Sequence, residues 1–164
     1  MPSRLLIALL SSSLSLTAAA VVQLLPAGQF AARDGRPGPG KSWTLTDAQG
    51  RQIAAALNAQ SARTRFLFDV DHQTIRAEAN GQPAPAAGWA TRFEWRPGQG
   101  LYALDATWTD QARAWIESGQ YAYISPVITF DDAGAVTGVL MAAITNYPAL
   151  LGMEPLGAEL SARL

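Results

Sequence analysis

The sequence predicts an α+β fold that is mainly β: one β-barrel or curled sheet with a few surrounding helices. Residues 65–71 alternate aromatic or branched side chains with other side chains, as a half-buried strand does. Residues 88–95 and 101–108 read as a hairpin around a turn that contains proline and glycine. Only two short helices are predicted, near 47–60 and after Thr109, so strands must supply most of the core.

The totals indicate one domain and exclude several classes of function. The chain has 164 residues, 49% of them hydrophobic, and a domain of this length buries roughly 70% of the surface exposed when unfolded. Its net charge of −1 gives no electrostatic basis for binding nucleic acid or an anionic membrane. It has no cysteine, which excludes disulfides, thiolate metal sites and cysteine nucleophiles. We expect no cofactor and no metal.

The N-terminal segment has two interpretations. Arg4, the apolar run 5–10 and the alanines at 18–20 have the form of a signal peptide with a small-residue cleavage site. The alternative is a first strand, a small-residue loop and a second strand over 21–25. No run reaches the roughly 18–20 apolar residues that a transmembrane helix needs.

Capping residues set the expected helix boundaries. Thr46 and Gln49 have capping-box spacing at the start of the helix over 47–60. Thr109 is the N-cap of the second helix, and Gly119 is placed to end it.

The remaining expected elements are strands and loops. Strands are expected over 121–130 and 136–144, joined by a short turn. Residues 33–41 are rich in glycine and proline and predict a loop. A polar loop is expected over 73–86.

His72 is the only histidine, and it follows directly after the strand 65–71. An imidazole with a pKa near 6.5 is the natural proton acceptor at neutral pH. The alternative is a histidine at a strand end with no catalytic role. Asp69 and Asp71 suggest a metal site with it, but in an extended chain their side chains would point away from that of His72. We therefore predict no metal there.

Ser125 lies inside an apolar strand and directly before Pro126. A buried hydroxyl must find a partner, and proline removes one donor of the strand ladder, so pairing is expected to be interrupted there. Ser125 is therefore a candidate nucleophile, and the alternative is a strand serine bonded to backbone. No Gly-x-Ser-x-Gly motif is present, which disfavours an α/β-hydrolase.

Six sequence blocks, in order between about residues 21 and 153, resemble the Mu-like prophage I proteins, a family of phage head-maturation proteases and scaffolds. The blocks are 22–28, 33–37, 69–73, 83–89, 123–127 and 145–150. The family is similar to prohead proteases and, more remotely, to herpesvirus assemblins. The resemblance implies an assemblin-like barrel over residues 1–153, with 154–164 as a tail or the start of a truncated scaffold extension.

The resemblance also implies His72 as the general base and Ser125 as the nucleophile. Assemblins use a second histidine as the third member, which this chain lacks. Asn146 is the nearest candidate by motif, and Asp105 and Glu94 are others. A pair assisted by water or a backbone carbonyl is a further alternative.

The function implied is a serine endopeptidase that cleaves phage scaffold and major capsid proteins, and itself, inside the procapsid in the host cytoplasm. A homo-oligomer is compatible with this role, and neither nucleic acid nor membrane is expected as a partner. One alternative is a non-catalytic scaffold or capsid-assembly protein of the same fold. Another is a secreted β-rich binding domain behind a cleaved signal peptide.

Overall fold

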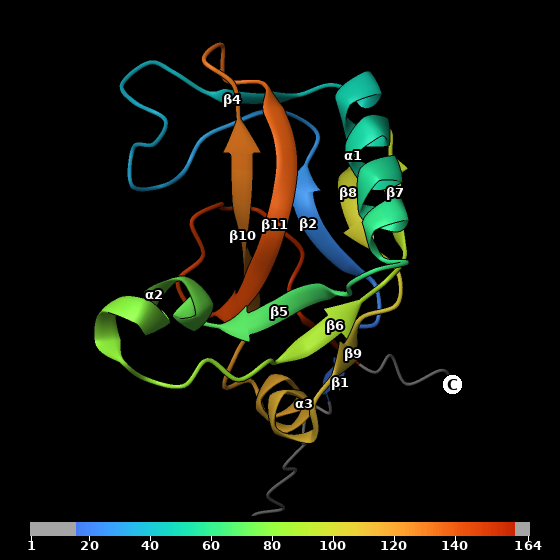
Figure 1. The fold of residues 1–164 in the computed structure, drawn as a ribbon, viewed down its shortest axis with the longest axis vertical. Helices are drawn as coiled ribbons and strands as arrows, with labels where there is room; N and C mark the ends of the chain where they lie inside the picture. The colour runs from blue at the N-terminus through green and yellow to red at the C-terminus, as the bar shows by residue number, and fades with distance from the viewer. Residues whose placement is uncertain (1–15, 160–164) are drawn as a thin grey trace, which may run out of the picture.

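The computed structural model describes residues 16–159, which form a mainly β structure with three helices (Figure 1). The elements in order are β1 (Leu16–Ala18), β2 (Val22–Pro26), β3 (Gly28–Phe30), β4 (Trp43–Leu45), α1 (Asp47–Gln60), β5 (Phe66–Val70), α2 (Gln73–Asn80), β6 (Gly88–Ala90), β7 (Phe93–Arg96), β8 (Gly100–Ala103), β9 (Thr107–Trp108), α3 (Asp110–Glu117), β10 (Tyr123–Phe130), β11 (Val136–Thr145) and β12 (Gly157–Glu159).

The strands form several sheets. The largest has the order β10-β11-β5-β6-β9, with β10 antiparallel and β5 parallel to β11. A second sheet has the order β2-β8-β7, and β1 pairs with β12 and β3 with β4. The mainly β prediction is confirmed, but these sheets do not close into one barrel within residues 16–159. The likeness to assemblins stays a prediction.

The predicted hairpin forms, but it is divided between two sheets. One antiparallel register runs from Gly88 opposite Trp108 to Arg96 opposite Gly100. Its outer part, β6 with β9, belongs to the five-stranded sheet, and its inner part, β7 with β8, belongs to the three-stranded sheet. Asp105 lies at the break and accepts hydrogen bonds from the backbone N–H groups of Thr91 (2.9 Å) and Arg92 (3.0 Å). The hairpin therefore links the two sheets.

Two helices follow the prediction. α1 spans the expected residues, and both hydrogen bonds of the Thr46–Gln49 capping box are present. α3 starts after the Thr109 cap and ends just before Gly119, whose φ of 75° suits glycine.

The polar loop predicted over 73–86 is wrong for its first half, because residues 73–80 form α2. Arg76, Ala77 and Glu78 favour helix, and Gly81 ends it in the left-handed conformation. No residue of α2 is fully buried, so the sequence lacks the apolar stripe that would have indicated a helix.

Aromatic side chains connect the sheets in the core. Phe66 packs edge-on against Phe68 and Phe93, and Phe68 also contacts Trp108. Figure 1 shows α1 beside β7 and β8, and the Trp95 indole donates a hydrogen bond to Asp47 at the start of α1 (2.9 Å).

Gly50 gives a prediction about stability. In an exposed helix, Gly→Ala stabilises by up to about 1 kcal/mol. A Cβ at Gly50 would overlap the Trp95 indole, which cannot withdraw without leaving the core. We therefore expect Gly50→Ala to lower the free energy of unfolding by about 1–3 kcal/mol, measured by urea denaturation. The exposed Arg51→Ala is the control and should stay within about 0.5 kcal/mol. A Gly50→Ala chain more stable than the parent would contradict the packing.

The described part of the predicted C-terminal tail, residues 154–159, packs on the body of the domain. Leu156 is buried; its carbonyl accepts a hydrogen bond from the backbone N–H of Ala19, and its own N–H donates one to the carbonyl of Ala122. Glu154 accepts a hydrogen bond from the Tyr102 hydroxyl (2.8 Å), and β12 pairs with β1. Residues 154–159 therefore contact the rest of the domain, and the domain boundary expected at residue 153 stays a prediction.

Most of the predicted signal peptide (1–15) and the last residues of the predicted tail (160–164) lie outside the described residues. Among residues 16–159, no helix is long and apolar enough to cross a membrane.

Candidate active site

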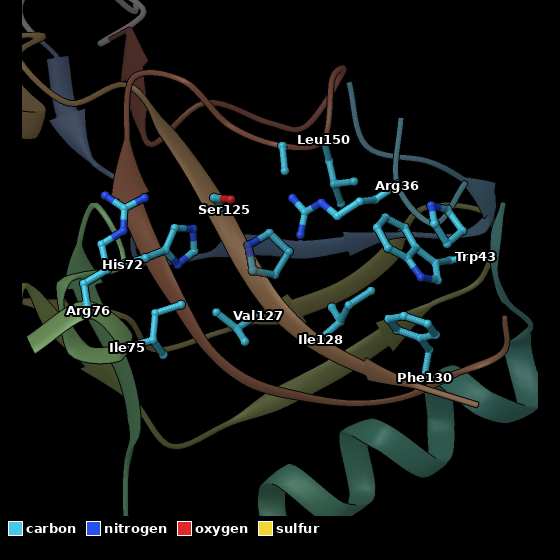
Figure 2. A pocket seen from close by; sticks show the side chains of 13 residues that line it. Arg36, Trp43, His72, Ile75, Arg76, Ser125, Val127, Ile128, Phe130 and Leu150 are labelled. Atoms are coloured by element: carbon cyan, nitrogen blue, oxygen red, sulfur yellow. The ribbon is translucent and has the colours of Figure 1, made fainter. Parts of the chain in front are cut away.

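His72 and Ser125 both line a pocket of about 540 Å³ (Figure 2). Its lining joins β10, α2, the loop before β4 and the segment after β11. The lining residues are Arg36, Pro37, Trp43, His72, Ile75, Arg76, Ser125, Pro126, Val127, Ile128, Phe130, Ala149 and Leu150. Two residues singled out from the sequence, 53 positions apart, thus meet at one cavity.

Ser125 lies on β10, one of the two edge strands of the five-stranded sheet. Its register partner is Ala143 on β11, and the pairing shifts register between Val127 and Ile128. The interruption expected near Pro126 is therefore present. The Ser125 side chain is almost buried, with 4% of the residue exposed, and its hydroxyl has no hydrogen-bond partner within the described residues. It is thus available to a group that enters the pocket.

His72 lies at the turn between β5 and α2. The strand ends at Val70, and Asp71 and His72 have φ of 50° and 59°, in the left-handed region. Aspartate and histidine are among the side chains that tolerate this region best. His72 is the N-cap of α2, but its ring makes no capping hydrogen bond. The His72 ring is therefore not used in capping the helix, and it lines the pocket instead.

The His72 ring is partly buried, and its Nδ1 atom is fully buried with no hydrogen-bond partner in the described part of the chain. Burial is the largest cause that lowers the His72 pKa below its usual 6.5. Asp69 and Asp71 oppose this by attraction, while Arg76 and Arg36 add to it by repulsion. The net effect keeps the ring neutral, the form that accepts a proton, at pH 7.

Polar side chains lie at one end of the pocket, together with Ile75, and aromatic side chains lie at the other. Figure 2 shows His72 near Ser125 with Arg76 beyond it, and Trp43 and Phe130 at the opposite end. The Arg36 side chain reaches into the space between, and its guanidinium also pairs with Asp34 (2.8 Å). The arrangement suits a ligand with a polar reacting centre and an apolar side chain.

The three candidates for a third member lie elsewhere. Asn146 is not among the residues lining the pocket. Its side chain bonds the backbone of Gln120 (2.6 Å) and Ala122 (3.1 Å). Asp105 holds the break in the hairpin described above, and Glu94 pairs with Arg96 (2.8 Å). The structure does not bring any of them to the His72–Ser125 pair.

Asp69 is the acidic side chain that sequence reasoning set aside. The extended geometry that would have pointed it away from His72 ends at Val70, so strand alternation does not apply to the histidine. Asp69 is fully buried, and its charge acts on His72. Among residues 16–159, no group of three or more His, Asp or Glu side chains is placed to hold a metal ion.

Comparisons with known proteins give one consistent family. The model of the "Mu-like prophage I protein, N-terminal domain" matches residues 22–157. The chain is 38% identical over 147 residues to "Protease I" of Escherichia phage Mu, covering 83% of this chain and 39% of that protein. It is 36% identical over 150 residues to the "Mu-like prophage FluMu I protein" of Haemophilus influenzae, covering 87% of this chain and 41% of that protein.

The chain thus spans about two-fifths of the length of these relatives. No solved structure matches it.

Proposed function

Because this chain belongs to the Mu-like prophage I protein family, we propose that it is a serine endopeptidase domain acting in phage procapsid maturation. One relative carries the name Protease I, which supports a peptidase in this family. The observation that carries the serine mechanism is the shared pocket of Ser125 and His72. Ser125 supplies a nucleophilic oxygen without a competing partner in the described chain, and His72 supplies a neutral imidazole.

The proposed reaction is acyl transfer in two steps. The Ser125 Oγ attacks the scissile carbonyl while His72 takes its proton, and the protonated imidazole then gives that proton to the leaving amine. The peptide C–N bond breaks and an acyl-enzyme ester remains, which water hydrolyses by the reverse proton route. Pro126 has no N–H to donate to the developing oxyanion, so the cation of Arg36 in the pocket is suited to stabilise it.

The substrate we propose is an extended polypeptide that lies along β10. An edge strand presents backbone groups that can pair with a further strand. The residues of β10 that line the pocket are Ser125, Pro126, Val127, Ile128 and Phe130. The pocket therefore follows the strand past the nucleophile, and its apolar end at Trp43 and Phe130 would receive a substrate side chain.

We further propose that scaffold and major capsid polypeptides are the natural substrates, with cleavage inside the procapsid in the host cytoplasm. Cleavage of the protein's own continuation belongs to the same proposal. This extension depends on the resemblance to prohead proteases.

The proposed activity can be tested with a mixture of synthetic peptides of defined sequence. Incubation with the purified chain should produce internal cuts, identified by mass spectrometry, with an apolar residue at a fixed position from the cut. The control is the double variant Ser125→Ala, His72→Gln purified in the same way, which separates this activity from a contaminating protease. No internal cuts, or equal cutting by parent and double variant, would contradict the proposal.

A further inference from the structure

Ser125, the proposed nucleophile, is one of three residues that lie side by side on the neighbouring strands β10, β11 and β5. Ser125 on β10 is the register partner of Ala143 on β11, and Ala143 is the register partner of Asp69 on β5. Side chains of register partners project from the same face of a sheet. Neighbouring strands lie about 4.8 Å apart, so the backbones at Asp69 and Ser125, which are two strands apart, are separated by about 10 Å. The intervening side chain is only a methyl group, which leaves room above it for an imidazole.

The Asp69 carboxylate is held at the base of the turn that carries His72. It is 0% exposed, and its Oδ2 accepts a hydrogen bond from the backbone N–H of Thr74 (2.8 Å) in the first turn of α2. His72 lies between these two residues in the chain and caps the helix without using its side chain. The bond from Thr74 therefore fixes the turn that holds the imidazole.

Two buried atoms on this turn have complementary chemistry and no partner in the described residues. They are Asp69 Oδ1, an acceptor, and His72 Nδ1, which donates when protonated. A buried carboxylate oxygen without a hydrogen bond is costly, so it requires a partner, which can be an ordered water, an ion or a group that bonds to it during function. In structures without substrate, hydrogen bonds of this kind are often long and tighten in the complex.

We propose that Asp69 is the positioning residue for His72: its Oδ1 orients the imidazole through Nδ1–H and stabilises the imidazolium that forms when Ser125 is deprotonated. This assignment rests on the proposed function for its catalytic consequence. It fills the third position that Asn146, Asp105 and Glu94 do not reach. Asp69 acts through His72 and does not touch the substrate.

A purely structural role for Asp69 is the competing explanation, since its carboxylate caps α2. Asp69→Asn separates the two roles. Asparagine caps helices about as well as aspartate, so the bond to Thr74 and the fold are kept, while the negative charge is lost. Asp71→Asn is the matched control, because Asp71 is the neighbouring carboxylate, is exposed and bonds to the Tyr121 hydroxyl (3.1 Å).

The first measurement is an NMR titration of His72, which as the only histidine gives a single imidazole signal. The charged groups that act on it are Asp69, Asp71, Arg76 and Arg36. Removing the Asp69 charge should lower the pKa of His72, and removing that of Asp71 should lower it less. Nitrogen chemical shifts of the unaltered chain should place the proton of the neutral ring on Nδ1. An Nε2–H tautomer, or no pKa change in Asp69→Asn, would overturn the proposal.

The second measurement is peptide cleavage. We expect Asp69→Asn to lower kcat by about 10²-fold or more with little change in KM, and to move the acid limb of the pH profile to lower pH. Asp71→Asn should stay within about threefold. An active parent with unchanged Asp69→Asn kinetics would overturn this proposal alone. An inactive parent would count against the proposed function, and the NMR titration would still decide the role of Asp69.

Discussion

Replacing Ser125 with alanine is expected to lower kcat/KM for peptide cleavage by about 10⁴-fold or more, because no other group takes the place of the attacking oxygen. The fold should not change. The hydroxyl is nearly buried and makes no hydrogen bond within residues 16–159, so its removal leaves no acceptor or donor stranded. The stability cost should therefore stay within about 1 kcal/mol.

The comparison needs the rate and the melting temperature of the same samples. Ser118→Ala, on the exposed end of α3, is the control and should keep the parent's rate. Ser125→Cys should keep a measurable part of the activity and become sensitive to thiol reagents, since a thiol is also a nucleophile. If Ser125→Ala cleaves as fast as the parent while folding normally, Ser125 is not the nucleophile.

Replacing His72 with alanine is expected to lower kcat/KM by a similar factor, because nucleophile and base act as a unit. For the same reason the double variant with Ser125→Ala should be no slower than either single variant. If the double variant instead lost kcat/KM by the product of the two single-variant factors, the residues would act independently, which would contradict the mechanism.

The pH profile of the parent gives a separate check on His72. The neutral ring is the active base, so kcat/KM should rise with pH through the pKa of the folded chain. Burial lowers that pKa below 6.5, with repulsion from Arg76 and Arg36 in the same direction and attraction by Asp69 and Asp71 opposing it. The acid limb should therefore lie below pH 6.5. An acid limb clearly above pH 6.5 would contradict the assignment of His72, in the surroundings described above, as the titrating base.

The sequence predicted the parts of the fold that depend on local chemistry. The Thr46–Gln49 capping box places the start of α1, and Gly119 stops α3. The division of the hairpin between two sheets was not predictable, because it depends on Asp105 bonding across the chain to Thr91 and Arg92. Local patterns determine where a strand forms, whereas the sheet it joins is a tertiary property.

The candidate site was predicted in part for a similar reason. His72 stood out as the only histidine, and Ser125 as a hydroxyl beside a proline in an apolar strand. Asp69, the positioning residue that we propose, was set aside because the extended strand pattern was continued two residues too far. Asp71 and His72 turn into the left-handed region, a change that the helix-forming residues and glycine cap of α2 would have indicated.

The central claim is that His72 activates Ser125 in their shared pocket. Labelling with a serine-directed phosphonate, followed by mass spectrometry of the digested chain, tests it most directly. We predict one adduct, on Ser125, that forms faster as the pH rises through the pKa of His72 and is lost in His72→Ala. An adduct on another residue, or equal labelling of Ser125 in the parent and in His72→Ala, would contradict it.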